Sequence, residues 1–286
     1  MGIGDLVWLF VLFAALQPVI QQRMQDAMRR RKIAQIETKR GSRVILMVYR
    51  QETMRFLGFP LARYIDMNDS EAMMRAIHLT DKDVPIDIIL HTPGGLLLAA
   101  MQIARAISNH PSKVTVFVPH MAMSGGTLIA LAADEIVMCN HSVLGPIDPQ
   151  INNMPAASLI YATEQKPIGR VDDETLILAD VGRKAMKQIE ASAIAFLSDH
   201  MAPEKAAETA RLLSEGHWTH DHPIFPTDAK DLALPVSTDM PVEVLELMTL
   251  YPQPTRMQRN VEYLPSRRER TAPAQSPVHA PAVEGS

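Results

Sequence analysis

The sequence predicts an α/β domain in which a mainly parallel sheet is flanked by helices. Strand-like and helix-like segments alternate through the middle of the chain, an order that is typical of parallel sheets. Two strand-like segments run into glycine-bearing corners, HTPGG at residues 91–95 and MSGG at residues 123–126, and a helical pattern follows each corner. A chain of 286 residues, of which 47% are apolar, is long enough to bury the core of such a domain.

The expected elements can be placed in order along the chain. Strands are expected at residues 44–49, 85–90, 114–119, 135–139 and 234–236, where apolar residues cluster in short runs. Helices are expected at residues 70–77, 96–107, 127–133, 176–197, 202–213 and 228–232, with Ser70 as the cap of the first. These elements define one domain over residues 42–250.

Residues 1–22 differ in character from the domain. Their apolar run, broken by Gln17 and Pro18, is short against the ~20 residues that span a bilayer, and a basic cluster follows it. A cleaved signal peptide has its basic residues before the apolar run and a small-residue cleavage site after it, and this segment has neither feature. We therefore expect a retained single-pass membrane anchor, with an interfacial helix as the alternative. Positive charge after the run predicts that the domain is cytoplasmic.

The segments on either side of the domain are polar. Residues 23–41 are basic and helix-prone, which predicts a solvated helical stalk that can also touch anionic lipid headgroups. Residues 251–286 are rich in proline and polar residues and lack apolar periodicity. We expect this tail to be disordered, because it has too little apolar surface to offset the chain entropy.

Charge and cysteine content exclude several classes of function. The net charge of −4 gives no reason to expect a nucleic-acid partner. Cys139 is the only cysteine, so an intrachain disulfide and a zinc–thiolate cluster are excluded, and its strand-like surroundings predict a buried small hydrophobe. The sequence has no Walker-type phosphate loop, so energy-dependent unfolding of a substrate would require a separate ATPase partner. We expect no cofactor.

Ser124 is the candidate nucleophile. It stands at a strand-to-helix corner and is followed by two glycines, where the following N–H groups point toward whatever the hydroxyl attacks. Serine becomes a good nucleophile in such a setting only when a base is also present. The amides of Gly95 and Gly125, one from each corner, are the expected donors of an oxyanion hole. The alternative is a glycine-bearing turn that merely starts a helix.

The two corners together carry a family resemblance. TPGGL followed by MSGGTLIALAADEIVM resembles the Clp/crotonase superfamily of serine peptidases. Within it the chain is most similar to the serine dehydrogenase proteinase family, a membrane-associated relative of the Clp proteolytic subunit and of signal peptide peptidase A. VLGPIDPQI and WTHDHPI also match, with His222 where an aromatic residue is expected. The resemblance covers about residues 42–236 and implies a Clp protease/crotonase-like fold, a peptide or protein substrate, and a homo-oligomer.

The resemblance also implies partners for the serine. The family order of serine, aspartate and histidine falls on Ser124, Asp148 and His220. In that arrangement His220 accepts the serine proton, and Asp148 orients the imidazole and stabilises its charged form.

Other interpretations of the same segments stay open. Asp148 also fits a turn residue that bonds its own backbone, and Asp221 also fits the orienting carboxylate. His217 or His222 also fits the base. The three histidines resemble a metal site, but no sequence signal fixes further ligands, so we expect no metal.

A serine–lysine dyad and two further classes of function are alternatives. Signal peptide peptidase A uses such a dyad, and Lys166, Lys184 and Lys187 lie where a lysine base would be supplied. Crotonase-type enzymes of the same fold bind acyl-coenzyme A, and a ring scaffold that presents peptides without cleaving them is the non-enzymatic alternative. Ser124 and the anchor favour a membrane-anchored serine peptidase that forms an acyl-enzyme, and this is the function that we expect.

Overall fold

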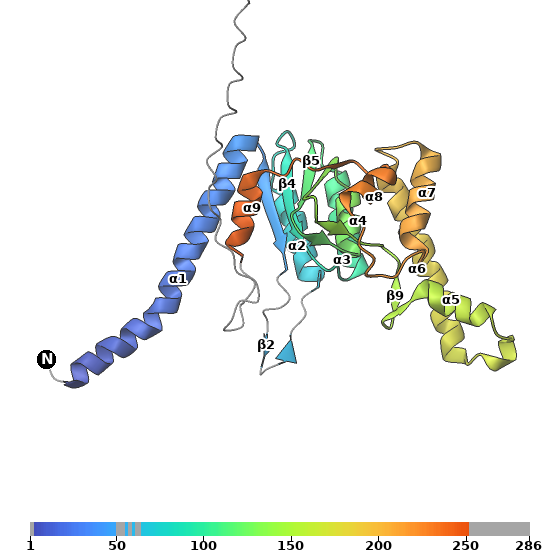
Figure 1. Cartoon of the computed structure of the whole chain (residues 1–286), viewed down its shortest axis with the longest axis horizontal. Coiled ribbons are helices and arrows are strands. Elements are labelled where there is room, and N and C mark those ends of the chain that lie inside the picture. The colour runs from blue at the N-terminus through green and yellow to red at the C-terminus, as the bar shows by residue number, and fades with distance from the viewer. Residues whose placement is uncertain (1–2, 50–54, 57–58, 61–63, 252–286) are drawn as a thin grey trace, which may run out of the picture. The chain divides into compact units, whose positions relative to one another are not determined.

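The computed structural model of the protein describes residues 3–49, 55–56, 59–60 and 64–251, and a five-stranded sheet forms its core (Figure 1). The strands are β1 (Arg43–Val48), β4 (Ile86–His91), β5 (Val114–Val118), β7 (Glu135–Met138) and β11 (Val236–Ser237). They follow one another across the sheet in that order, and every neighbouring pair is parallel. The predicted parallel α/β architecture is confirmed.

The central strands are buried on both faces, as parallel sheets require. Every residue of β4 and β5 is buried, and Ile88 of β4 stands opposite Ile45 of β1 on one side and Val116 of β5 on the other. Alternate side chains of a strand point to opposite faces. Ile88 and Leu90 therefore pack in one apolar layer, and Ile89 packs in another.

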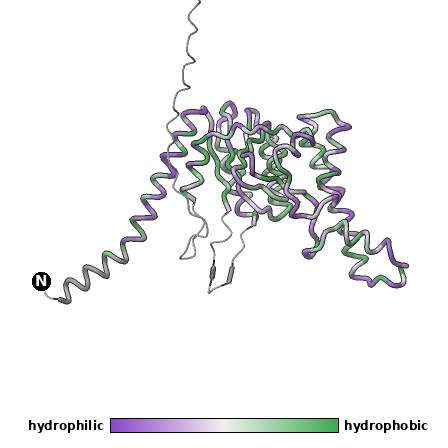
Figure 2. The backbone as a smooth tube through the Cα atoms, in the orientation of Figure 1, coloured by the Kyte–Doolittle hydropathy of each residue, from purple (hydrophilic) through white to green (hydrophobic). Residues whose placement is uncertain are grey.

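Helices cover the face of the sheet that contains Ile88. The helices that contribute most of the buried residues to this layer are α2 (Met67–His78), α3 (Leu97–Ser108), α4 (Gly125–Leu131), α6 (Asp173–Leu197) and α7 (Pro203–Ser214). Beside α6 lies α5 (Ala156–Glu164), joined to it through the 3₁₀ turn Ile168–Arg170, and α8 (Pro226–Asp231) precedes β11. Figure 2 shows the hydrophobic backbone concentrated in the sheet and the helices against it.

Among the described residues, three pairs of short strands lie outside the main sheet. They are β2 (Arg55–Phe56) with β3 (Phe59–Pro60), β6 (Met121–Ala122) with β8 (Val143–Leu144), and β9 (Gln150–Ile151) with β10 (Met154–Pro155). The first and third pairs are antiparallel, whereas β6 and β8 are parallel. The second and third pairs position the candidate site described below.

The opposite face of the sheet is covered by α1 (Ile3–Arg40) and α9 (Val242–Thr249). Ile36 of α1 and Val244 and Leu247 of α9 are buried in the same apolar layer as Phe117 of β5. In Figure 1, α9 lies beside the carboxyl-terminal half of α1. The two helices therefore form one layer over this face.

Ion pairs tie α9 to α1. Lys32 Nζ lies 2.7 Å from Glu246 Oε2, and Lys39 Nζ lies 2.6 Å from Glu243 Oε1. The Lys39 contact holds the pKa of Glu243 below its usual range. Since both lysines belong to the predicted stalk, this part of α1 is fixed against the domain.

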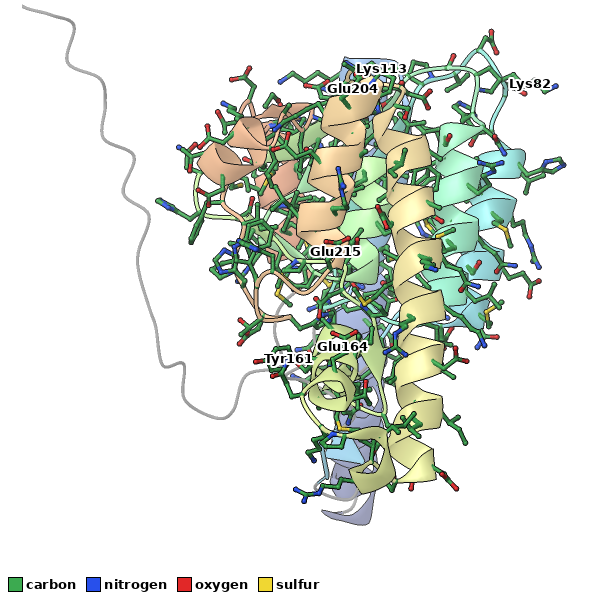
Figure 3. The ribbon with its side chains drawn as sticks, turned by 90° about the vertical axis from the view of Figure 1, so that its right-hand side faces the viewer. Lys82, Lys113, Tyr161, Glu164, Glu204 and Glu215 are labelled. Atoms are coloured by element: carbon green, nitrogen blue, oxygen red, sulfur yellow. The ribbon has the colours of Figure 1, made fainter. Side chains whose placement is uncertain are left out.

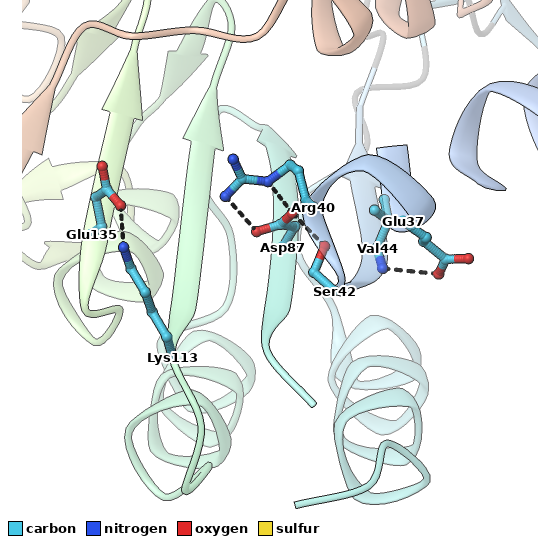
Figure 4. Close-up of polar contacts among 7 residues, drawn as sticks. All are labelled: Glu37, Arg40, Ser42, Val44, Asp87, Lys113 and Glu135. Atoms are coloured by element: carbon cyan, nitrogen blue, oxygen red, sulfur yellow. Dashed lines mark hydrogen bonds and ion pairs between the residues drawn. The ribbon is translucent and has the colours of Figure 1, made fainter. Parts of the chain in front are cut away.

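A buried polar cluster joins the end of α1 to the sheet (Figure 4). Arg40 donates through Nε and Nη2 to the carboxylate of Asp87 on β4, the second of these at 3.1 Å, and Ser42 Oγ donates to the same carboxylate at 2.6 Å. The Arg40 guanidinium also lies 4.8 Å from the centroid of the Phe117 ring. This bidentate arrangement fixes the orientation as well as the distance between helix and strand.

α1 is a single helix across both the predicted anchor, residues 1–22, and the predicted stalk, residues 23–41. Residues 1–2 lie outside the described residues, as do the side chains of residues 3–12, 14, 15 and 18. Within the part of the chain that the structure describes, no helix has both the length and the apolar character needed to cross a membrane. The predicted disordered tail lies outside the described residues except for Tyr251.

Two sequence predictions need correction. Asp66, not Ser70, caps α2: its carboxylate accepts two backbone N–H groups of the first turn. Ser70 lies inside the helix, where its hydroxyl donates to Gln102 Oε1 at 2.9 Å. Cys139 is half-buried rather than buried, because it follows the last residue of β7, and burial raises the pKa of its thiol.

Candidate active site

The two glycine corners meet at the carboxyl edge of the sheet, where β4 and β5 end. Thr92, which follows β4, pairs with Ala122 of β6 in a parallel bridge. Thr92 N–H donates to Met121 O at 3.1 Å, and Met123 N–H donates to Thr92 O at 3.0 Å. These bonds extend the ladder past the ends of the strands. The corners that the sequence singles out therefore lie side by side.

Ser124 occupies the corner between β6 and α4. Its φ of 52° and ψ of −118° lie outside the regions that residues with a side chain normally adopt. The side chain makes no capping hydrogen bond to α4, and the residue is half-buried. The strained backbone thus presents a hydroxyl at the start of a helix without engaging it in the helix cap.

Close approach of the two corners explains why each contains glycine. A Cβ on Gly94, whose φ is +105°, would lie 2.8 Å from Ser124 Cβ, and a Cβ on Gly95 would lie 2.3 Å from Ile65 N. In the second corner, a Cβ on Gly126 would lie 2.4 Å from Cγ2 of Thr92. Separations below 3.0 Å require neighbouring atoms to move, so a larger residue at Gly94 would force the corners apart and one at Gly95 would displace the backbone of Ile65.

The amides of Gly95 and Gly125 are placed as hydrogen-bond donors for a ligand. Ile65 N–H donates to Gly94 O at 2.9 Å, and Leu96 N–H donates to Ile65 O at 2.8 Å. Because backbone groups of an extended chain alternate in direction, the N–H of the intervening Gly95 points away from Ile65. Gly125 begins α4, and N–H groups of the first turn have no acceptor within their own helix.

Asp148 and His220 form a pair 72 residues apart in sequence. His220 Nδ1 lies 2.8 Å from Asp148 Oδ1, and the Asp148 side chain is 2% exposed whereas that of His220 is 33% exposed. With Nδ1 directed at the carboxylate, the neutral ring carries its proton there and keeps the lone pair of Nε2 as an acceptor. Asp148 also accepts a hydrogen bond from Gln150 Nε2 at 2.7 Å.

The other candidate histidines lie in a different environment. His217 makes an edge contact with Trp218, with ring centroids 5.1 Å apart, and His222 stacks on the same indole at 5.1 Å. The family pattern places an aromatic residue at position 222. The imidazole of His222 takes the place of that ring, because it too is flat and stacks on the indole of Trp218. Asp221 is exposed, and it is Asp148 that contacts His220.

The candidate lysine bases point to solvent. Lys166 and Lys187 are exposed, and Lys184, whose side chain is 68% exposed, pairs with Asp180 one turn away on α6. Ser124 lines a pocket, and the residues of α6 that line the same pocket are Ala185 and Ile189. Nearby, Tyr161 and Glu164 project outward from α5 (Figure 3). The three lysines thus do not line the pocket that Ser124 lines.

One pocket of about 520 Å³ contains every residue that the sequence assigns to the site. Ser124, Asp148, His220, Gly95 and Gly125 all line it. Its remaining walls are mostly apolar and include, among others, Leu96, Leu97, Leu128, Ile147 and Ile151. Among the described residues, no three histidine, cysteine or acidic side chains are grouped so that they would hold a metal ion.

Sequence reasoning missed two contributors to this pocket. Ile65 fixes the Gly94–Gly95 corner through its backbone, and no pattern in the sequence marks a backbone contact between segments so far apart. Gln150 lies in the stretch that resembles the family, but a lone glutamine gives no signal of its partner.

A parallel α/β sheet with a serine, an aspartate–histidine pair and two glycine residues around one pocket is the arrangement expected of a serine hydrolase. The model of the ClpP-like SDH-type serine proteinases matches residues 1–276, and the chain belongs to that family. Family membership makes it a serine peptidase.

The chain is similar to several known proteins. It is 48% identical to each of two proteins of Methanocaldococcus jannaschii, Uncharacterized protein MJ0137 and Uncharacterized protein MJ1495, over 90% of this chain and 90% and 88% of theirs. Among solved structures, a mutant of the 1510-N membrane-bound stomatin-specific protease aligns with a TM-score of 0.45 and 21% identity. That alignment covers 71% of this chain and 94% of the other.

Proposed function

We propose that the protein cleaves peptide bonds through an acyl-enzyme, with Ser124 as nucleophile, His220 as general base and Asp148 as the residue that orients His220. The observation that carries this assignment is the 2.8 Å contact between His220 and the buried Asp148 in the pocket that Ser124 also lines. Such a pair leaves one ring nitrogen available to accept the hydroxyl proton.

The reaction would proceed in two balanced stages. Ser124 Oγ attacks the substrate carbonyl while its proton moves to His220 Nε2, and the tetrahedral oxyanion receives hydrogen bonds from the amides of Gly95 and Gly125. The carbon–nitrogen bond then breaks, the amine leaves with the proton from His220, and an ester remains on Ser124. Water, deprotonated by His220, hydrolyses that ester and restores the serine.

We also propose that the amino-terminal part of α1 anchors the protein in a membrane, with the catalytic domain in the cytoplasm. The apolar run before the basic cluster supports this proposal. Deleting residues 1–22 should move the protein from the membrane fraction to the soluble fraction. Unchanged pelleting of the deletion variant would contradict the anchor. The substrate is proposed to be a peptide or protein, and the working form a homo-oligomer.

Labelling by a fluorophosphonate probe tests the catalytic assignment. The wild-type protein should be labelled at one serine, and Ser124→Ala should abolish labelling because the attacking oxygen is lost. Ser198→Ala, which removes an exposed serine that does not line the pocket, is the matched control and should label at the wild-type rate. His220→Ala should slow labelling strongly.

Two results would contradict the assignment. Labelling that persists in Ser124→Ala would place the nucleophile elsewhere. Loss of labelling in Lys166→Ala or Lys184→Ala, with His220→Ala unaffected, would replace the histidine base by a lysine.

A further inference from the structure

The carboxylate of Asp148 is bonded on both of its oxygens. Oδ1 faces His220 Nδ1 at 2.8 Å, and Oδ2 accepts a hydrogen bond from the side-chain amide of Gln150 at 2.7 Å. A buried ionised carboxylate is costly unless its oxygens receive hydrogen bonds. The side chain of Asp148 is only 2% exposed, so water does little to meet this need. Gln150 supplies the second bond.

A tightly constructed hairpin places Gln150 against Asp148. In this hairpin, formed by β9 and β10, Gln150 pairs with Pro155. Asn152 and Asn153 connect the strands with φ values of 50° and 61°, as a two-residue type I′ turn requires. Two residues with positive φ leave little freedom of register, so the start of the hairpin is fixed.

The hairpin is also held from outside. Ala156 N–H donates to Pro149 O at 2.9 Å, which ties the start of α5 to the residue between Asp148 and Gln150. Ala156 in turn packs against Gly182 of α6, where a Cβ would lie only 3.1 Å from Ala156 Cβ. The position of the glutamine amide therefore depends on the packing of α5 against α6.

We propose that Gln150 is a positioning residue for the catalytic pair, an inference that rests on the proposed function of Ser124, His220 and Asp148. A carboxylate held at one oxygen can rotate about its χ2 bond, because that torsion is broad. The amide of Gln150 fixes the second oxygen and so holds the first in line with His220 Nδ1. It acts through its bond to Asp148, and its side chain also lines the pocket.

The proposal predicts a specific kinetic signature. Gln150→Leu keeps the approximate volume but removes the donor, and it should lower the maximal rate of fluorophosphonate labelling by about 10- to 100-fold, as is typical when a residue that orients a catalytic ligand is lost. Gln150 also lines the pocket, and leucine fills about the same volume there, so the probe concentration that gives half the maximal rate should change less than about threefold.

A double-mutant cycle distinguishes positioning from a general structural role. In an Asp148→Asn background the carboxylate is already absent, so Gln150→Leu should change the labelling rate by less than about twofold. An equally large loss in both backgrounds would overturn the proposal, since the glutamine would then act independently of Asp148. An unchanged rate in the single variant would overturn it too.

Controls separate this test from that of the proposed function. Asn152→Gly alters the same hairpin at a residue that the pocket lining does not include, keeps the positive φ, and should label like the wild type. Absence of labelling in the wild-type protein would reject the proposed function itself. If Gln150→Leu unfolds, Gln150→Met replaces it, and unfolding of both variants would show a structural role and overturn the proposal.

Discussion

Two aspartates are buried to the same extent in this protein, and their partners set them apart. The side chains of Asp87 on β4 and Asp148 after β8 are each 2% exposed, and both oxygens of each carboxylate are bonded. Asp87 faces Arg40, which carries its charge at every accessible pH, as Figure 4 shows for the cluster with Ser42. Asp148 faces a histidine, a residue type that exchanges protons near neutral pH.

The difference shows that a buried carboxylate can have either of two roles, and that its partner decides which. A carboxylate beside a permanent cation forms a fixed connection, here between α1 and the sheet, and its contribution is to stability. A carboxylate beside a proton acceptor stabilises a charge that arises only during reaction. The comparison predicts that substitutions of the two aspartates affect different measurements.

Asp148→Asn should have the largest effect. The amide no longer stabilises a protonated His220 and favours the wrong ring tautomer, so the maximal rate should fall by about 10⁴-fold. The rate of fluorophosphonate labelling measures this loss, and thermal unfolding monitored by circular dichroism checks that the fold survives. A rate within tenfold of the wild type would break the distinction between the two aspartates.

Gly94→Ala should have the next largest effect on activity. The new Cβ would meet Ser124 Cβ at 2.8 Å and would also occupy a backbone with a φ of +105°. Displacement of the hydroxyl by even about 1 Å costs on the order of 100-fold in rate. Gly169→Ala is the matched control, because a Cβ there meets no atom within 4 Å. Equal labelling rates for the two variants would show that the corners are not tightly packed.

Asp87→Asn should lower stability and leave the chemistry intact. It leaves the Arg40 guanidinium without its counter-ion. Because the Arg40 side chain is 32% exposed, the free energy of unfolding should fall by about 3 kcal/mol, near the low end for a broken buried ion pair. Chemical denaturation measures this change. The labelling rate per folded molecule should match the wild type, and a loss like that of Asp148→Asn would erase the contrast.

The smallest effect concerns pH and the contact between α1 and α9. The Lys39 ammonium holds the pKa of Glu243 below its ordinary value of 4.5, so the stabilisation is present above that pH and is lost as the pH falls through the lowered value. Glu243→Gln should therefore be less stable than the wild type at pH 7, by about 0.5 kcal/mol because Lys39 is largely exposed, and equally stable at the acid end.

Denaturation at several pH values measures this difference. Glu208→Gln, in the exposed pair with Lys205, controls for general effects of charge. A difference between Glu243→Gln and the wild type that stays constant with pH would contradict the assignment to the carboxylate.

Local patterns predicted much of the fold, because its strands are short apolar runs and its corners need glycine. The strands at residues 86–91 and 114–118 and the Ser124 corner could be identified from composition and spacing alone. The pairing of Asp148 with His220 could not, since it joins residues 72 positions apart, and it was available only through resemblance to a family.

Other features depend on tertiary contacts that have no local signal. The bond between Gln150 and Asp148 depends on the hairpin, and the hairpin in turn depends on the packing of α5 against α6. The contact between Arg40 and Asp87 depends on where α1 docks. Ser70 was mistaken for a cap because Asp66, four residues earlier, competes for the same role and forms the better capping box.

The backbone of Ser124 has a consequence for how such a protein changes over generations. At its φ of 52°, a non-glycine residue costs the folded state on the order of 1–3 kcal/mol, which glycine would recover. Under selection for thermal stability alone, random substitution would therefore favour glycine at this position and remove the reactive hydroxyl. Retention of the serine therefore requires selection for a property other than the stability of the folded state.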